Sequence, residues 1–164
     1  MTIDLDARAR ERQRLRSTYL ADTATRSAST ARGVHHVALL CSDVERTINF
    51  YQGLLGFPLV ELFENRDYRG STHLFFDIGH GNTLAFFDFP GLDLGPYAEV
   101  LGGLHHLALS VDDGSWQAAK GRLEVAGVAI HLDSEISMYF SDPDGVRLEL
   151  IAEDLGSLYG LPLQ

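Results

Sequence analysis

An internal repeat constrains this chain more than any other feature of its sequence. The stretch GVHHVALLCSD at residues 33–43 returns as GLHHLALSVDD at residues 103–113. Each copy begins with a glycine, an apolar residue and a histidine pair, and continues as an apolar strand. Each then ends in aspartate, a residue that often caps the N-terminus of a helix. The repeat indicates that the fold consists of two copies of one small unit.

The residues after each repeat predict the same succession of elements. A helical pattern follows in both halves and ends near a glycine, Gly56 or Gly127, that suits a helix C-terminus. An apolar strand comes next, and then a hairpin whose turn carries Gly, Asn, Asp or Pro. Each half is therefore predicted to fold as β-α-β-β-β. Two such units packed together can bury a core that one unit could not.

Composition divides the chain into segments around this repeat. We expect a single domain at 33–153, made of module one (33–88), module two (103–153) and a Gly- and Pro-rich linker between them (89–102). Residues 1–32 form a basic N-terminal arm, and residues 154–164 form a C-terminal tail.

The N-terminal arm differs in charge from the rest of the chain. It holds seven arginines and four acidic residues, a net charge of +3, so the remainder of the −10 chain carries −13. Its sequence permits a helix but offers no apolar stripe. We expect a short surface helix or a flexible arm followed by a linker. A basic arm that binds an acidic neighbour is the alternative.

The bulk composition excludes several classes of function. A net charge of −10 argues against an extended phosphate-binding surface, so nucleic acid is not an expected partner. No apolar run is long enough for a membrane span, and the N-terminus lacks the apolar core of a secretory signal. Cys41 is the one cysteine, which precludes an intramolecular disulfide and fits a cytoplasmic location.

The histidine pairs are the first candidates for chemistry. Neighbouring side chains of a strand point to opposite faces, so one histidine of each pair faces inward. If the repeats are related by approximate two-fold symmetry, His36 and His106 face each other across a cavity. His35 and His105 are expected to face outward or to support the scaffold.

A carboxylate on the last strand completes the candidate set. Aligned through the turn glycines, Ala85 of module one corresponds to Glu149 of module two. A carboxylate on a core face is costly unless it is paired or binds a metal. Simple alternation along the strand equally allows Glu149 to be exposed. Two imidazoles and a carboxylate form a facial triad, which suits Fe(II), Mn(II) or Zn.

These motifs together resemble the vicinal-oxygen-chelate superfamily. The HHVAL stretch, the helix containing FYQGLLGF and the strand pair ending in PDGVRLEL carry the resemblance, which covers about residues 33–153. The superfamily includes glyoxalase I, extradiol dioxygenases, fosfomycin-resistance enzymes, methylmalonyl-CoA epimerase and bleomycin-binding proteins. The resemblance implies an α+β fold in which two tandem βαβββ modules form a half-open mixed-sheet barrel around one metal cavity.

The resemblance also implies a ligand set. The superfamily's ligand positions fall on His36, Ala85, His106 and Glu149. Alanine cannot ligate a metal, which counts against glyoxalase I activity and leaves His36, His106 and Glu149 as three ligands. Fe(II) is the expected ion, with Mn(II), Zn and Ni as alternatives.

Two further motifs are similar to those of extradiol dioxygenases. Tyr139 precedes Glu149 by ten residues in a Y-x-x-x-P-x-G-x-x-x-E pattern. The stretch NTLAF resembles one in which those enzymes carry an active-site histidine, but Asn82 stands in its place, and His73 or His80 is then the candidate substitute. The alternative for Tyr139 is a buried aromatic residue bonded to the backbone.

The function predicted from these resemblances is that of a metal-dependent enzyme acting on a small molecule. We expect ring cleavage of a catechol-type substrate, with Tyr139, His73 and Asn82 as catalytic residues. Another metal-assisted isomerisation, lyase, epimerisation or transfer reaction is the second hypothesis, and ligand sequestration without catalysis is the third. The expected partner is an aromatic or vicinal-oxygen molecule. A homodimer is one arrangement, and the cavity lies either within one chain or across two swapped chains.

Overall fold

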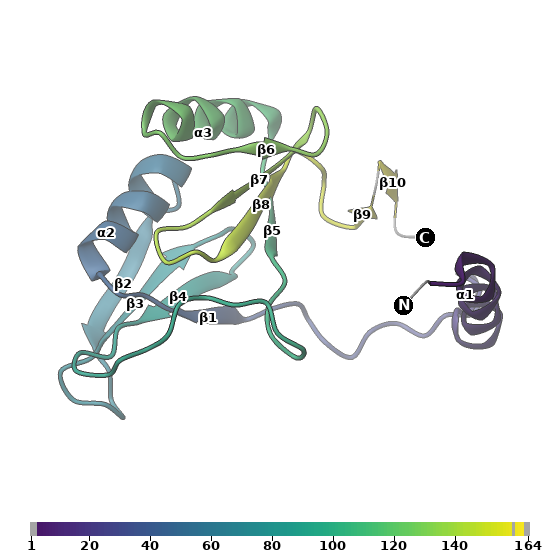
Figure 1. Ribbon diagram of the computed structural model, residues 1–164, viewed down its shortest axis with the longest axis horizontal. Coiled ribbons are helices and arrows are strands. Elements are labelled where there is room, and N and C mark those ends of the chain that lie inside the picture. Colours follow the sequence, from purple (N-terminus) through teal and green to yellow (C-terminus); the bar gives the residue numbers. More distant parts are fainter. Residues whose placement is uncertain (1–2, 159, 163–164) are drawn as a thin grey trace. The chain divides into compact units, whose positions relative to one another are not determined.

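The computed structural model describes residues 3–158 and 160–162 and divides into two units, the first ending at Gly33 (Figure 1). The first unit contains helix α1 (Leu5–Tyr19), which is capped by Asp4 through a hydrogen bond from the Ala7 backbone N–H. None of its residues is buried, as expected of a helix without an apolar stripe. The helix-permissive pattern of the arm thus forms a surface helix.

Two four-stranded sheets of identical connectivity build the second unit. The first has the order β1-β4-β3-β2 and the second the order β5-β8-β7-β6. Their bounds are β1 (His36–Leu40), β2 (Leu59–Glu64), β3 (Thr72–Asp77), β4 (Thr83–Phe87), β5 (Leu107–Ser110), β6 (His131–Leu132), β7 (Ser137–Ser141) and β8 (Arg147–Ile151). In each sheet one parallel pair, β1 with β4 or β5 with β8, accompanies two antiparallel pairs. The predicted α+β fold of two tandem βαβββ modules is confirmed. No strand pairing joins the two sheets within the described ranges, so they do not close into a full barrel.

Each module has its helix after the first strand, as predicted. In module one α2 (Val44–Ile48) continues as the π-helix η1 (Asn49–Leu55), and in module two α3 (Asp113–Val125) is α-helical throughout. The side chains of Asp43 and Asp112 accept hydrogen bonds from backbone N–H groups of the first turn. Gly56 ends the π-helix with φ +84°, a left-handed conformation that glycine adopts without the strain of a side chain.

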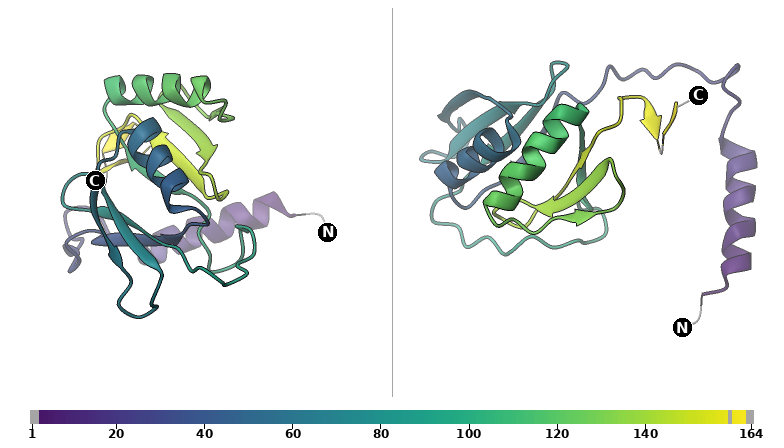
Figure 2. Two further views of the ribbon diagram at one scale, coloured as in Figure 1. Left: turned by 90° about the vertical axis from the view of Figure 1, so that its left-hand side faces the viewer. Right: turned by 90° about the horizontal axis from the view of Figure 1, so that it is seen from above.

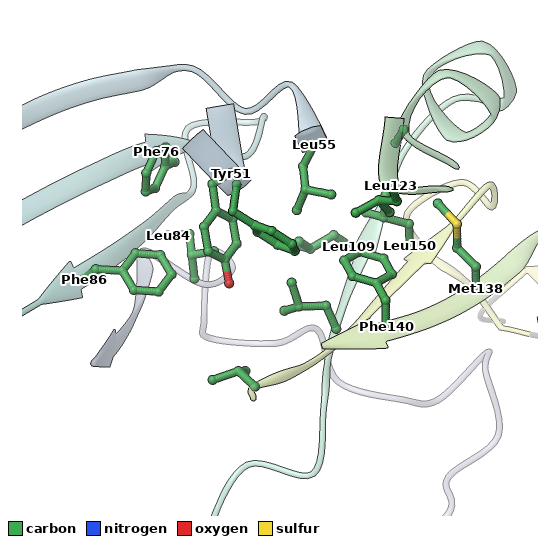
Figure 3. Packing of buried hydrophobic residues seen from close by; sticks show 14 of the residues in the cluster. Tyr51, Leu55, Phe76, Leu84, Phe86, Leu109, Leu123, Met138, Phe140 and Leu150 are labelled. Carbon is green, nitrogen blue, oxygen red and sulfur yellow. The ribbon is translucent and has the colours of Figure 1, made fainter. Parts of the chain in front are cut away.

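The core lies between these helices and one face of each sheet (Figure 3). Tyr51 of η1 packs against Phe76 and Phe86 of the first sheet, and Leu123 of α3 and Leu150 of β8 are fully buried. Burying each such side chain contributes roughly 1.5–3 kcal/mol. The opposite face of each sheet, which we call the open face, carries the residues that alternate with these core residues.

Polar contacts also join the two modules. The hydroxyl of Tyr51 donates to Asp142 Oδ2 over 3.0 Å in the buried interior. Ser42 and Arg46 both donate to Asp144 in the turn between β7 and β8. Burial raises the pKa of Asp142, although its hydrogen bonds counter this effect. The β7–β8 hairpin of module two is therefore tied to the first strand and helix of module one.

The segment after module two forms a small hairpin of β9 (Ser157–Leu158) and β10 (Leu161–Pro162) (Figure 2). It falls in the predicted C-terminal tail, of which Tyr159, Leu163 and Gln164 lie outside the described residues. Throughout the part of the chain that the structure describes, no helix has the length and apolar character needed to cross a membrane.

Candidate metal site

The register of the parallel strands places Ala85 and Glu149 at equivalent positions. Ala38 pairs with Ala85 in the first sheet, and Ala108 pairs with Glu149 in the second. Paired residues of neighbouring strands share a face, and so do residues two apart along one strand. Glu149 therefore shares the open face with Ala108, as Ala85 does with Ala38.

His106 and Glu149 lie together on the open face of module two. His106 Nε2 is 3.3 Å from Glu149 Oε2, and Ser137 Oγ donates to Glu149 Oε1 over 2.5 Å. Glu149 is only 7% exposed, and within the described residues no lysine or arginine forms an ion pair with it. Glu149 is thus buried, and the alternative in which it faces solvent is wrong.

Tyr139 borders the same pair. It sits opposite Glu149 in the register of β7 and β8, and its ring centroid is 5.4 Å from that of His106, with the rings edge to face. The predicted ligands His106 and Glu149 and the predicted catalytic Tyr139 therefore form one cluster.

The third predicted ligand lies on the open face of module one. His36 is exposed, and its ring is 6.4 Å from that of Phe75. Phe75 pairs with Ala85, so the position that corresponds to Glu149 is covered by an aromatic ring rather than occupied by a ligand. Within the described residues, no three His, Cys, Asp or Glu side chains lie close enough together to hold one ion. One chain thus brings together His106 and Glu149 but not His36, which departs from the expectation that all three converge in one cavity.

His73 belongs to an aromatic wall next to His36. Its ring stacks on Phe87 with centroids 3.8 Å apart, and the rings of Phe75 and Phe63 are at 4.2 and 5.2 Å. Burial lowers the pKa of His73, and the charge of His36 lowers it further. His73 Nε2 is buried without a hydrogen-bond partner in the described structure. A neutral imidazole in an apolar wall results.

Asn82 lies at the end of the turn that joins β3 and β4. Its side-chain amide donates to the carbonyl of Gly79 over 3.1 Å, and its backbone also bonds to that carbonyl. The next residue, Thr83, pairs with His36 in the register. Asn82 therefore stabilises the turn beside His36 through its amide.

Sequence reasoning missed several residues of the site. Ser137, which bonds Glu149, lies two residues before Tyr139 on the same strand, so strict alternation could have placed it on the open face. Glu99 and Arg147 form an ion pair at 2.8 Å next to His105. Glu99 belongs to the linker, and no sequence signal places it beside module two.

A cavity of about 650 Å³ lies elsewhere, between the end of β1, the linker and the β7–β8 turn. Leu40, Cys41, Leu92 and Asp144 are among its lining residues, and none of the three predicted ligands is. Ala38 also lines it, so the cavity borders the open face of module one without containing the predicted ligands.

The chain is similar to known proteins in both sequence and fold. Residues 33–150 match the Glyoxalase/Bleomycin resistance protein/Dioxygenase superfamily, and the chain belongs to that superfamily. It is 29% identical over 141 residues to the "Putative ring-cleaving dioxygenase MhqA" of Bacillus subtilis, a match that covers 80% of this chain and 44% of MhqA. It is 28% identical to the lactoylglutathione lyase of Haemophilus influenzae, covering 71% of this chain and 89% of that enzyme. The chain thus spans less than half the length of the dioxygenase relative.

Solved structures agree with the fold. A structure titled as a putative dioxygenase from Bacillus subtilis matches with a TM-score of 0.65 and 28% identity, over 79% of this chain and 43% of that one. The fosfomycin resistance protein FosX of Mesorhizobium loti matches with a TM-score of 0.57 over 77% of this chain and 95% of that one, and its 23% identity supports the fold alone.

The donor set fits a divalent metal ion of the kind that members of this family use. An imidazole nitrogen and a buried carboxylate oxygen lie 3.3 Å apart, and the carboxylate lacks a cationic side-chain partner in the described structure. Nitrogen and oxygen donors in this combination suit Fe, Mn, Zn or Ni. A third ligand is needed for a facial triad. His36 is the candidate, but within one chain it lies apart from His106 and Glu149.

Proposed function

We propose that this protein is a metal-dependent enzyme that cleaves the ring of a catechol-type substrate in the extradiol manner. One observation carries the proposal: Glu149 is buried beside His106 on an open sheet face, and among the described residues no lysine or arginine forms an ion pair with it. A buried carboxylate without a cation is costly, and a bound metal ion removes that cost.

His36, His106 and Glu149 would hold the ion, with Fe(II) as the proposed metal. When bound, the ion supplies Lewis-acid character and free coordination positions for a substrate with two adjacent oxygens. Alanine at position 85 adds no fourth protein ligand, so the side of the site that faces module one is left for the substrate.

The other residues bind and orient the substrate. The wall of Phe63, Phe75 and Phe87 around His73 suits a planar, weakly charged ring. Tyr139, beside His106, is within reach to hydrogen-bond a substrate oxygen. His73 is kept neutral by burial and by His36, so it is suited to accept a proton at its unpartnered Nε2. Asn82 holds the turn that positions this wall.

A second copy of the chain would complete the site. His36 is exposed on module one and lies apart from the pair on module two of the same chain. Two chains related by a two-fold axis could bring the open face of module one against that of module two in each of two sites. We therefore propose a homodimer in which each metal site takes His36 from one chain and His106 and Glu149 from the other.

A metal-assisted reaction without oxygen is the second candidate. The position where extradiol enzymes carry a histidine holds Asn82, whose amide is engaged with Gly79. The similarity to a relative named lactoylglutathione lyase also supports this candidate. In that case the same ion would stabilise an enolate or alkoxide on a non-aromatic substrate.

Metal analysis of protein purified without added metal, followed by oxygen uptake with a series of catechols, tests these alternatives. Bound iron with oxygen consumption supports the dioxygenase. Bound metal without oxygen consumption, together with turnover of a thiohemiacetal or an epoxide, supports the second candidate. Purified protein that neither retains nor binds a divalent metal would contradict both and favour a binding protein.

A further inference from the structure

We propose that His35 and His105 are positioning residues that select the tautomer of the adjacent ligands His36 and His106. This inference rests on the metal site proposed above. It assigns a role to the first histidine of each pair, which is not one of the proposed ligands.

The two pairs share one unusual geometry. His35 Nδ1 is 2.8 Å from His36 Nδ1, and His105 Nδ1 is 2.7 Å from His106 Nδ1. The rings are nearly perpendicular in both cases, at 78° and 75°. Adjacent strand residues normally point to opposite faces, but His35 and His105 precede their strands, so both rings of a pair can meet. The recurrence in both modules argues for a shared purpose.

A contact between two Nδ1 atoms requires one to donate and the other to accept. A neutral imidazole carries one proton, on either Nδ1 or Nε2. Whether Nδ1 donates or accepts in this contact therefore decides whether Nε2 of the same ring carries a proton. If His106 donates from Nδ1, its Nε2 keeps a lone pair for a metal. If it accepts at Nδ1, its Nε2 carries the proton instead.

The contacts in module two correspond to the second arrangement. His106 Nε2 lies 3.3 Å from Glu149 Oε2, on the side of the ring that carries the proton in that arrangement. Its Nδ1 then accepts from His105 Nδ1–H, and His105 Nε2 accepts from Arg147 Nη1 at 3.3 Å. Donors therefore run in one direction, from Arg147 through His105 and His106 to Glu149.

A metal ion held by His106 Nε2 would require the opposite direction. His106 would then carry its proton on Nδ1 and donate to His105 Nδ1, and His105 would carry its proton on Nε2. Each ring keeps one proton, so neither changes its charge. The ion pair of Glu99 and Arg147 offers both an acceptor, 3.8 Å from His105 Nε2, and a donor, so either tautomer of His105 has a partner.

The two histidine pairs differ in the side-chain contacts that hold their first histidine. No hydrogen bond or ion pair from another side chain reaches His35 Nε2 in the described structure, whereas His105 is held by the linker residue Glu99 and by Arg147. We therefore expect His105 to matter more than His35 for metal affinity.

Zn(II) binding to the purified full chain tests the proposal. The dissociation constant is measured by competition with a chromophoric chelator for wild type, His105→Ala, His105→Asn and His35→Ala, with Gln117→Ala on the exposed side of α3 as the control. We expect His105→Ala to weaken binding about 10–100-fold, as loss of a ligand's outer partner usually does. His105→Asn, which keeps a polar group near Nδ1, should recover most of the loss, and Gln117→Ala should have no effect.

Long-range ¹⁵N–¹H correlation spectra supply a readout that is independent of any variant. Wild-type His106 should carry its proton on Nε2 without metal and on Nδ1 with Zn(II). A proton on Nδ1 in both states, or an unchanged dissociation constant for His105→Ala, overturns the proposal.

Failure of the metal site itself would be distinguishable. If Zn(II) affinity is the same in wild type and His106→Ala, the proposed ligand set is wrong and this inference falls with it. If His106→Ala loses the ion while His105→Ala retains wild-type affinity, only the positioning role is wrong.

Discussion

Tyr139 and His106 meet edge to face on module two, at the point where the substrate is proposed to bind. Replacing Tyr139 with phenylalanine keeps the ring and removes the hydroxyl. We expect kcat to fall about 100-fold, the scale of a lost proton donor or acceptor, with no change in bound metal per chain. Tyr19→Phe, at an exposed tyrosine of α1, is the control. An unaltered kcat would remove Tyr139 from the mechanism.

Cys41 provides a prediction on pH dependence. It is 4% exposed, and burial raises the pKa of its thiol to about 11. The unfolded thiol has a pKa of about 8.5, so the folded state holds the proton more tightly. Stability therefore falls as pH rises from about 8.5 through 11, because the unfolded chain releases its proton first. The free energy of unfolding of wild type relative to Cys41→Ala should drop over this range. A constant difference between the two proteins contradicts the assignment.

At the scale of single residues, the sequence indicates the chemistry but not all the contacts. The repeat identifies the histidine pairs, and alignment of the turn glycines gives Glu149 the position equivalent to Ala85, as the strand register has it. Alternation alone cannot decide whether Glu149 is buried, because the face that a strand presents depends on what packs against it. The contact of Glu99 with module two depends on the path of the linker, for which local sequence carries no signal.

At the scale of elements, the π-helix η1 carries one of the polar contacts that join the modules. Tyr51 is fully buried, and its hydroxyl donates to buried Asp142. Tyr51→Phe should lower the free energy of unfolding by about 1–3 kcal/mol, since it leaves a buried carboxylate oxygen without that donor. Urea denaturation measures the change, and Tyr19→Phe on the exposed helix α1 is the control. Equal destabilisation by both variants would contradict the role of this contact.

The order of the helices and strands was predictable from the sequence, but the change from α-helix to π-helix in module one was not. Caps at Asp43 and Asp112 and the glycines after each helix gave the helices their bounds. The pattern from Val44 to Leu55 predicts one continuous helix, but the structure changes from α to π at Asn49. A π-helix has i→i+5 hydrogen bonds and a wider turn than an α-helix, but a segment of seven residues is too short for this change of period to be visible in the sequence.

At the scale of the whole molecule, the proposed homodimer predicts complementation between two inactive variants. His36→Ala and His106→Ala should each lose metal-dependent activity. In a mixed dimer, one site combines the intact His36 of one chain with the intact His106 and Glu149 of the other. Random exchange then restores about one quarter of wild-type activity, because half of the dimers are mixed and each has one complete site.

The measurement is activity after unfolding and refolding the two variants together, with each variant refolded alone as the control. Sedimentation analysis gives the oligomeric state in parallel. If the mixture stays inactive although both variants form dimers, the site does not draw its ligands from two chains.

Module packing is the part of the site that the sequence could not predict. The repeat shows that two units exist and which positions correspond, but not which open faces meet. That choice depends on the summed packing of many side chains, among them Tyr51, Phe140 and Leu123 in the shared core. Local sequence therefore cannot decide whether the cavity lies within one chain or across two swapped chains.

The unequal residues at positions 85 and 149 have a consequence for how such a protein can change over time. In the proposed dimer, module two would bind the ion through His106 and Glu149. Module one would supply one ligand, His36, and the aromatic surface around Ala85. Substitutions on that surface could alter which molecule is accepted without loosening the ion. A repeat protein whose two modules have different roles in this way can change its substrate through module one while the metal-binding residues of module two stay the same.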